Sequence, residues 1–506
     1  MIDTNALREK ILDLAIRGKL VPQDPNDEPA SVLLERIRVQ KQQMVKEGKL
    51  KAKDIKNDTI IFKGEDNLHY EQFQDGSVKC IEDEIPFELP EGWAWCRFGT
   101  YTINRDNERK PVSLSNRKDV EKNYDYYGAS GKIDKIDNYL FDEKLLLIGE
   151  DGANLVARTK PIAFFAEGKY WVNNHAHCID AIDKQLLEFL CYYINAIDLK
   201  MYITGAAQPK LNQDNMNKIL LPVPPQHEQE KIICEISNSF QCVLRIDNHM
   251  ANLKAEISLL KSKILDLAIR GKLVTQDPND EPASVLLERI RTEKEELIKQ
   301  GKIKRDKKES VIFKGEDNSY YQDLPENWEI TTLRKITTPL TLNDGDWILS
   351  ENMSQKGEVK LLQLGSIGNM VYIDKGFKYL TKQTFDELSC TAIFPKYLLI
   401  NRIISDKMCC CIIPNIEGTI ITTVDTCWIA PCSHVYNLKF LMYQLASPIF
   451  QSMVLMKATG TTRKRISKSN LIDLPLLFPP LVEQNRIVEA IEATFTQLDH
   501  IINCIS

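Results

Sequence analysis

Histidine and cysteine side chains gather at two places where metal chemistry can be considered. The two sets are His175, His177 and Cys178 in the segment HAHC, and Cys427, Cys432 and His434. Structural zinc sites usually take paired ligands in spacings such as CxxC, and neither set has that arrangement. The HAHC segment is also typical of a β-strand, in which alternate side chains point to opposite faces. We therefore predict no metal site and place these residues in a core or at a binding face.

The sequence also lacks the motifs of several enzyme classes. It has no Asn-Pro-Pro-aromatic or Asp-Pro-Pro-Tyr tetrapeptide of the amino-methyltransferases, no GxxxxGK[ST] phosphate loop and no GxGxxG turn. The acidic pair Glu150 and Asp151 in GEDGAN resembles part of a nuclease carboxylate cluster only superficially, because turn formation and capping explain it. We predict a non-catalytic chain that holds no cofactor of its own.

One stretch of the chain has the charge that phosphates attract. The net charge of -6 argues against a protein that simply coats nucleic acid. The segment KATGTTRKRISKSN, from Lys457 to Asn470, is nevertheless basic and contains no acid. A phosphate-binding segment and a solvated loop explain this stretch equally well when it is taken alone.

Length and composition predict a chain with more than one core. With 506 residues, of which 43% are hydrophobic, it is too long for one ordinary core. No apolar run is long enough to cross a bilayer, and the start MIDTNALREKILDL carries charge in every turn. We expect a soluble, cytoplasmic protein without a membrane partner. The cysteine count of 13 is odd and includes the adjacent trio Cys409, Cys410 and Cys411, which predicts reduced thiols.

Two internal repeats determine the expected architecture. Residues 11–38 recur at 264–291 with one change, Pro22 to Thr275. A fainter repeat joins residues 205–236 to 460–491, and shorter matches join IFKGEDN at 61–67 to 312–318 and LPEGW at 89–93 to LPENW at 324–328. In these registers the tail and the head of the chain together form one copy of the central segment. A linear tandem duplication does not give this pattern, which predicts a pseudo-twofold circular repeat.

The central segment is predicted to be one long helix. From Gln226 to Arg270 it contains no proline or glycine, and Gly271 follows as a natural stop. Its apolar residues step by alternating four and three, which is typical of a coiled-coil seam. We expect the two chain ends to pair antiparallel with it and to lie close together, although an ordinary buried core helix is an alternative. The predicted seam comprises Ile236, Phe240, Val243, Met250, Leu253, Ile257, Leu260, Ile264 and Leu267 in the centre, Ile491, Phe495 and Leu498 near the C-terminus, and Leu7, Ile11 and Leu14 near the N-terminus.

Between the helical segments, short β-branched and aromatic runs bounded by Gly, Asp and Asn predict strands and loops. The expected fold is α+β, with two α/β domains joined by two long antiparallel coiled-coil helices. The predicted domains are an N-terminal helical region and linker at 1–85, a first α/β domain at 86–222, a central helical region at 223–323, a second α/β domain at 324–477, and a C-terminal helix at 478–506.

The chain resembles the specificity subunits of Type I restriction-modification systems over nearly its whole length. The resemblance lies in LPEGW, IGEDGANL, AEGKYWVNNHAH, LLQLGSIGN, GAAQPKLN, GTTRKRIS, PPQHEQEKI and PPLVEQNRI. It implies two target-recognition domains that each read half of a bipartite, asymmetric site in double-stranded DNA, with helices that set the unread spacer. It also implies two adenine-methyltransferase subunits and translocating restriction subunits as partners, which would supply S-adenosylmethionine, ATP and Mg chemistry.

Polar and basic residues on the predicted loops are the candidate DNA contacts, because amides read adenine edges and guanidinium groups read guanine edges or bind phosphates. They are Asn154, Asn173, Asn174, His175, Gln208 and Lys210 in the first domain and Gln363, Arg402, Arg463, Lys464, Arg465 and Lys468 in the second. Turn capping by the asparagines and a structural role for Arg402 are alternatives.

Two other functions fit parts of the pattern. A coiled-coil adaptor that binds proteins would keep the repeat and the seam without basic loops. A fused restriction-methylation enzyme would need catalytic residues that the motif search did not find.

Overall fold

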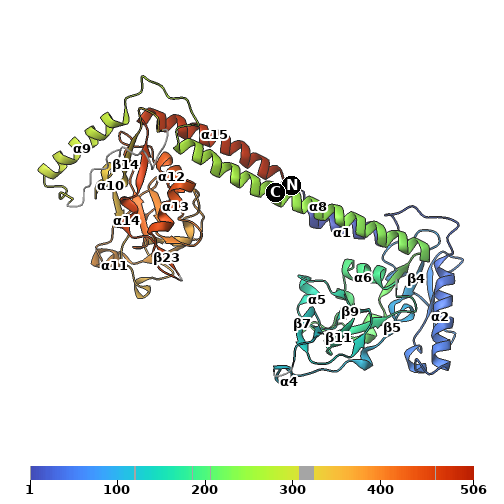
Figure 1. Cartoon of the computed structure of the whole chain (residues 1–506). Coiled ribbons are helices and arrows are strands. Elements are labelled where there is room, and N and C mark those ends of the chain that lie inside the picture. The colour runs from blue at the N-terminus through green and yellow to red at the C-terminus, as the bar shows by residue number, and fades with distance from the viewer. Residues whose placement is uncertain are drawn as a thin grey trace. The chain divides into compact units, whose positions relative to one another are not determined.

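The computed structural model describes residues 2–118, 121–184, 186–205, 207–306, 324–461 and 463–505, which form two compact units (Figure 1). Residues 2–249 form the first unit, and the residues from Met250 onwards form the second. The boundary lies inside α8 (Gln226–Ile269), a single helix of 44 residues. The second copy of IFKGEDN, at 312–318, lies outside the described residues.

The long helix forms as its sequence predicts. It begins directly after Pro224 and Pro225 and stops before Gly271, whose φ of +66° is the left-handed conformation that ends many helices. Among the described residues, no helix is long and apolar enough to cross a membrane. All 13 cysteines are free thiols, as expected.

The first unit combines helices at its chain ends with small sheets between them. Its helices are α1 (Thr4–Ile16), α2 (Ala30–Lys46), α3 (Phe98–Tyr101), α4 (Leu114–Lys118), α5 (Asn154–Ala157), α6 (Leu186–Ala196), α7 (Gln213–Asn217) and the start of α8. Its strands are β1 (Ile60–Lys63), β2 (His69–Gln72), β3 (Val78–Cys80), β4 (Ala94–Arg97), β5 (Ile103–Asn104), β6 (Tyr124–Gly128), β7 (Gly131–Ile136), β8 (Phe141–Asp142), β9 (Leu145–Gly149), β10 (Ala163–Ala166), β11 (Lys169–Val172), β12 (Ala176–Asp180) and β13 (Leu220–Val223).

Two four-stranded sheets form the first α/β domain. Their strand orders are β10-β9-β12-β5 and β7-β6-β11-β8. Strand β9 lies between β10 and β12 and pairs antiparallel with both. Its residues Leu145 to Ile148 are all buried, which explains why this strand is a continuous apolar run instead of an alternating one. The ribbon of β4 and β13 joins the beginning of the domain to its end.

The second unit repeats this plan. Its helices are the end of α8, α9 (Ala283–Lys299), α10 (Leu333–Ile336), α11 (Lys382–Glu387), α12 (Leu438–Ala446), α13 (Pro448–Lys457), α14 (Lys468–Ile472) and α15 (Leu481–Ile505). Its strands are β14 (Glu329–Thr332), β15 (Leu342–Asp344), β16 (Val359–Leu362), β17 (Phe377–Leu380), β18 (Leu398–Asn401), β19 (Ile403–Ile404), β20 (Cys410–Ile412), β21 (Thr419–Ile421), β22 (Thr426–Ile429), β23 (Lys464–Arg465) and β24 (Pro475–Phe478).

The two α/β domains share one strand topology. The order β20-β18-β22-β15 in the second unit matches β10-β9-β12-β5 in the first. The second sheets match as well, since β6 pairs parallel with β11 and β16 pairs parallel with β21. The ribbon of β14 and β24 corresponds to that of β4 and β13. The α+β prediction and the internal repeat are therefore confirmed, although the sequences of the two domains differ.

Helix α1 packs antiparallel along the first part of α8 in the first unit (Figure 1). Arg8 in α1 pairs with Asp247 at 2.6 Å, whereas Gln23 after α1 donates to Glu228 at the start of α8. Between these contacts, Ala15 packs against Ile232 and Ile236 in one apolar cluster. The apolar face of α8 is thus covered by the N-terminal segment of the chain.

Helix α15 packs in the same way on the last part of α8 in the second unit (Figure 1). Lys261 pairs with Asp499 at 2.5 Å, and Gln276 beyond α8 donates to Glu483 at the start of α15. These two contacts make the helices antiparallel. The predicted seam residues Ile257, Ile264, Ile491 and Leu498 are buried in the shared core.

Two predicted seam residues lie on the surface instead. Leu260 is 47% exposed and Leu7 is 40% exposed, so the seam prediction is wrong for both. At 100° per residue, Leu260 is rotated by roughly 60° from Ile257, away from the side that carries Lys261 and Leu265. Leu7 lies between Ile11 and Leu14 around α1, so rotation does not explain its exposure; it lies in the first turn of the helix. The remaining predicted seam residues are buried or partly buried: Ile236, Phe240, Val243, Met250, Leu253, Leu267, Phe495, Ile11 and Leu14.

Part of the N-terminal stretch expected as a linker is folded. Strands β1, β2 and β3 form a three-stranded antiparallel sheet within residues 60–80. Its inner face packs through Ile61 on a small core that includes Trp95 and Leu220. This sheet attaches the N-terminal region directly to the first α/β domain.

Candidate nucleic-acid interface

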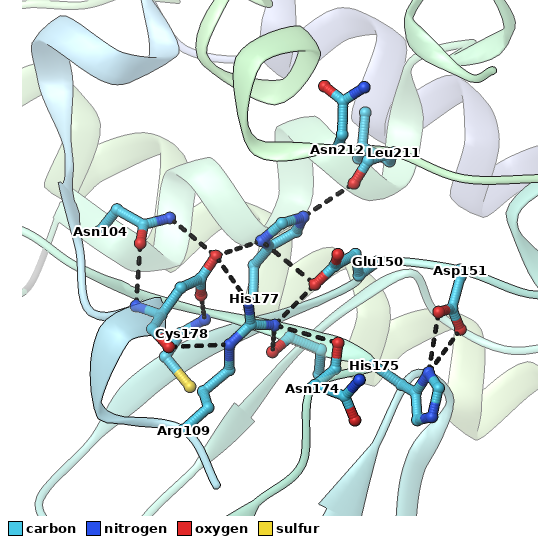
Figure 2. Close-up of polar contacts among 12 residues, drawn as sticks. Asn104, Arg109, Glu150, Asp151, Asn174, His175, His177, Cys178, Leu211 and Asn212 are labelled. Atoms are coloured by element: carbon cyan, nitrogen blue, oxygen red, sulfur yellow. Dashed lines mark hydrogen bonds and ion pairs between the residues drawn. The ribbon is translucent and has the colours of Figure 1, made fainter. Parts of the chain in front are cut away.

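A partly buried ion network lies where β9 and β12 meet the loop before α7. Arg109 donates to Glu150 at 2.7 Å and pairs with Asp106 at 3.2 Å, while Lys210 approaches the other oxygen of Glu150 at 3.1 Å. Figure 2 shows Arg109 beside Glu150, with His177 above them. Two cations thus face two carboxylates.

His177 connects this network to the chain that follows the loop. Its Nδ1 lies 2.5 Å from an Asp106 oxygen, and its Nε2 lies 2.8 Å from the carbonyl oxygen of Leu211 (Figure 2). The side chain is buried, and the neighbouring Cys178 belongs to the apolar cluster on the opposite face of β12. The alternation predicted for HAHC therefore separates these two side chains, and His177 has a structural role.

The carboxylates of the network are held in their charged form. Burial opposes ionisation of Asp106, but the hydrogen bond with His177 and the charge of Arg109 outweigh it and lower the pKa of Asp106. Burial likewise opposes ionisation of Glu150, and the contacts with Arg109, His177 and Lys210 bring the pKa of this carboxyl below its usual value.

Asp106, Glu150 and His177 form the group in the described residues whose ligand atoms lie within 4.8 Å of one another. The guanidinium of Arg109 already contacts both carboxylates, and both nitrogens of His177 have oxygen partners. The arrangement thus resembles a neutralised ion network more than a metal site. The histidine and cysteine sets considered from the sequence form no such group in the described part of the chain.

The loop closed by Thr204 and Lys210, here called the first hairpin loop, projects from this network. The backbone N–H of each of these two residues donates to the carbonyl of the other at 2.8 Å. Leu211 N donates to Glu150 O at 2.8 Å, and Gly152 N donates to Pro209 O at 3.0 Å. Backbone bonds and the Lys210 ion pair therefore fix the base of the loop to the end of β9.

The second unit has an equivalent loop, closed by Thr459 and Arg465 and here called the second hairpin loop. The N–H groups of its two closing residues donate to each other's carbonyls at 2.9 and 2.8 Å. Ile466 N donates to Arg402 O at 3.1 Å, just as Leu211 N donates to Glu150 O in the first unit. Arg402 therefore occupies in the second unit the backbone position that Glu150 occupies in the first.

The acid that pairs with the closing cation differs between the two units. In the first unit the closing cation Lys210 pairs with Glu150. In the second unit the closing cation Arg465 pairs with Asp425 at 2.9 Å. The two loops are therefore anchored by different acids on the same frame.

Comparison with known proteins finds relatives of this chain. A sequence model of the family described as "Type I restriction modification DNA specificity domain" matches residues 103–253. The EcoEI specificity subunit of Escherichia coli is 27% identical, over 98% of this chain and 89% of its own length. The EcoAI specificity subunit, also of Escherichia coli, is 31% identical, over 65% of this chain and 62% of its own. The chain is therefore similar to Type I restriction specificity subunits, and the family model matches a specificity domain within it.

A solved structure supports the fold of this chain. A chain from a study of assembly and conformational transition in a type I R-M system has a TM-score of 0.50 and 14% identity, over 83% of this chain and 94% of its own. At this identity the likeness concerns the fold alone.

Several predicted DNA contacts have structural roles. Asn173 is buried and accepts from the backbone N–H of His175, and Asn154 accepts from the N–H of Lys160. Arg402 is buried and donates to the carbonyls of Ile466 and Val424. Their burial or local bonding supports the alternatives of turn capping and a structural cation.

Other predicted contacts are paired on or near the surface. His175 pairs with Asp151 at 2.8 Å, and Lys210 and Arg465 hold the loop bases. Lys468 donates to Asn343. These groups retain some exposure, but each already has a neighbouring side chain as its partner.

The remaining predicted contacts have no side-chain partner among the described residues: Asn174, Gln208, Gln363, Arg463 and Lys464. Gln208, Arg463 and Lys464 share the two hairpin loops. Asp106 and Arg109 were not among the predicted residues, because no motif marks them. The equivalence of the loops was signalled by Gly205 and Gly460, which the repeat had already aligned.

Proposed function

We propose that this chain is a Type I specificity subunit and recognises a bipartite, asymmetric DNA site, with one α/β domain on each half of it. The observation that carries the proposal is that two domains of one topology differ in most of their side chains. Two domains with the same backbone topology can contact two half-sites in the same way, because both half-sites have the geometry of a DNA duplex. Different side chains on the two domains would then read different bases. The subunit itself is non-catalytic in this proposal.

Exchanging residues 89–222 for those of a relative tests the proposal. The subunit is purified with its methyltransferase partner, and the methylated adenines are mapped by sequencing. One half of the motif should change, and the other half and the spacer should stay. A change in both halves would contradict modular recognition. Unchanged methylation would favour the adaptor, and methyl transfer or cleavage by the isolated chain would favour a fused enzyme.

We further propose that the repeated segments 11–38 and 264–291 dock two copies of one methyltransferase subunit. Surface residues are identical in both copies, although the fold does not require it. Val32 is 45% exposed and its counterpart Val285 is 49% exposed, and the pair Arg36–Glu28 recurs as Arg289–Glu281. Equal surfaces suit two equal partners. S-adenosylmethionine, ATP and Mg would be bound by the methyltransferase and restriction subunits.

Single substitutions test the docking surfaces. Val32→Asp and Val285→Asp each place a charge on one copy and should each remove one of two bound methyltransferase subunits, as read by native mass spectrometry. The double variant should bind neither. Retention of two copies by both single variants would contradict this docking.

The helix α8 is proposed to set the spacer between the half-sites, since it contributes to both units and carries α1 and α15 as antiparallel partners. Inserting residues within α8 should change the methylated gap, or abolish activity where the helical phase is broken. An insertion that leaves both the gap and the activity unchanged would contradict this role.

A further inference from the structure

The two hairpin loops share a backbone geometry but carry different side chains. Gly205 has a φ of +84° and Gly460 a φ of +103°. A Cβ placed on either glycine would lie 2.5 Å from a carbonyl oxygen three residues later, that of Gln208 or of Arg463. Together with the matching cross-loop hydrogen bonds, this makes the loops equivalent at their closing residues, at their glycines, and at Gln208 and Arg463.

Within this shared frame, the polar groups divide into committed and uncommitted ones. The closing cations Lys210 and Arg465 are paired with Glu150 and Asp425. Gln208 and Arg463 occupy the same loop position, are exposed, and have no side-chain partner among the described residues. Both groups are hydrogen-bond donors, one neutral and one cationic.

A common geometry at both domains suits a ligand that is the same at both. If the half-sites differ in base sequence, the feature they share is the sugar–phosphate backbone. Amide and guanidinium donors both bind phosphate oxygens, and such contacts position a protein without reading sequence. Lys464, exposed and without a described partner, adds a second free charge to the second loop.

We infer that the two hairpin loops bind the phosphodiester backbone, one in each half-site, and do not read bases. Gln208 and Arg463 are the donors at the equivalent position, and the Lys210–Glu150 and Arg465–Asp425 pairs hold the loops in place. The inference rests on the proposed DNA recognition. It assigns base reading to other surfaces of the two domains.

Reciprocal variants of the subunit, each in complex with its methyltransferase partner, test this inference. Arg463→Gln gives the second loop the donor of the first, and Gln208→Arg does the converse. Lys263→Gln is a matched control, because Lys263 is an exposed lysine of α8 without a described partner. Affinity for a cognate and a scrambled duplex is measured between 50 and 200 mM salt, and the methylated motif is sequenced.

Arg463→Gln should weaken both duplexes by the same factor, about threefold to tenfold at the higher salt, and lower the salt slope by about 0.9. Gln208→Arg should strengthen both duplexes equally and raise the slope. The motif should remain unchanged in both variants, and Lys263→Gln should match the wild type.

A change of one base position in the motif would show that the loop reads bases and would overturn the inference. An effect no larger than that of Lys263→Gln would show that the loop does not contact DNA. Failure of the proposed function itself looks different, since the wild-type complex would then bind cognate and scrambled duplexes equally.

Discussion

The indole nitrogen of Trp93 donates a hydrogen bond to a carboxylate oxygen of Glu228 at 3.0 Å. Trp328 makes the same bond with Glu483, also at 3.0 Å. Each tryptophan comes from the matched opening motif of an α/β domain, and each glutamate lies in the first turn of a long helix. These bonds fasten each domain to its helix.

Removing the indole donor should destabilise one unit at a time. Trp93→Phe leaves a buried carboxylate with one donor fewer, which costs about 1–3 kcal/mol in the free energy of unfolding. Trp328→Phe should have a similar cost in the second unit. Urea unfolding followed by circular dichroism measures both changes.

Trp347→Phe is the control for these two substitutions, because Trp347 is 70% exposed. Its effect on the free energy of unfolding should stay within about 0.5 kcal/mol. If Trp93→Phe is no more costly than Trp347→Phe, the bond to Glu228 contributes little to the fastening.

The charge of Glu228 should make stability depend on pH. Burial raises the pKa of Glu228 above 4.5, and the hydrogen bonds from Gln23 and Trp93 offset part of this rise. Because the folded protein then binds more protons than the unfolded chain, stability falls as pH rises from the unfolded pKa through the folded one. Glu228→Gln removes this loss, since glutamine does not titrate.

The difference in unfolding free energy, Glu228→Gln minus wild type, should therefore increase from pH 4 towards neutral pH and then level off. Urea denaturation at a series of pH values measures it. A difference that is constant across this range would show that the carboxyl titrates alike in folded and unfolded chains.

How far the sequence predicts this structure depends on the range of the interactions. The pairing of α8 with the chain ends follows from local apolar periodicity and from near-identical repeats, so it was predictable. Leu260 shows the limit, because a regular heptad pattern does not reveal how far a single partner helix reaches around α8.

Local sequence patterns could not predict the ion network. Asp106, Glu150 and His177 lie on three separate strands or loops, and only the order β9-β12-β5 brings them together. The equivalence of Glu150 and Arg402 is seen from the backbone hydrogen bonds that each carbonyl accepts, because the two residues differ in charge. Side chains chosen by type, such as Asn173, proved to serve the fold when their neighbours became known.

A buried ion pair in the first unit should show strong coupling. Lys41 and Asp58 are both buried, with Nζ 3.0 Å from Oδ2, and Lys41 also donates to the carbonyls of Gly99 and Thr100. Lys41→Met leaves Asp58 as an unpaired buried charge and should cost about 3–5 kcal/mol. Asp58→Asn should also destabilise, by leaving the ammonium without its counter-ion.

The double variant should lose much less than the sum of the single losses, because neither charge remains uncompensated. Urea unfolding of the four proteins gives the coupling energy. Additive losses would contradict a direct interaction. In the second unit, Lys294 donates to the carbonyl of Arg334 at 2.7 Å, which is the counterpart of the Lys41 bond to Gly99.

The geometry of the second hairpin loop should depend on the missing side chain of Gly460. An alanine there would hold its Cβ 2.5 Å from the Arg463 carbonyl, so the loop would have to open. Gly418→Ala is a matched control, since Gly418 also has a positive φ, of +87°, but nothing lies within 4 Å of its Cβ position. Both variants place an alanine at a positive φ, which costs about 1–3 kcal/mol in backbone strain. Only in Gly460→Ala does the new Cβ also collide with a carbonyl oxygen.

If the loop binds phosphates through its shape, Gly460→Ala should weaken DNA binding by about tenfold more than Gly418→Ala, with the methylated motif unchanged. Gly205→Ala should do the same through the first loop, because its Cβ meets the Gln208 carbonyl at the same distance. Duplex affinity at two salt concentrations and melting temperatures of the complex separate binding from stability. Equal affinities for Gly460→Ala and Gly418→Ala would mean that the shared loop geometry serves the fold and not the DNA.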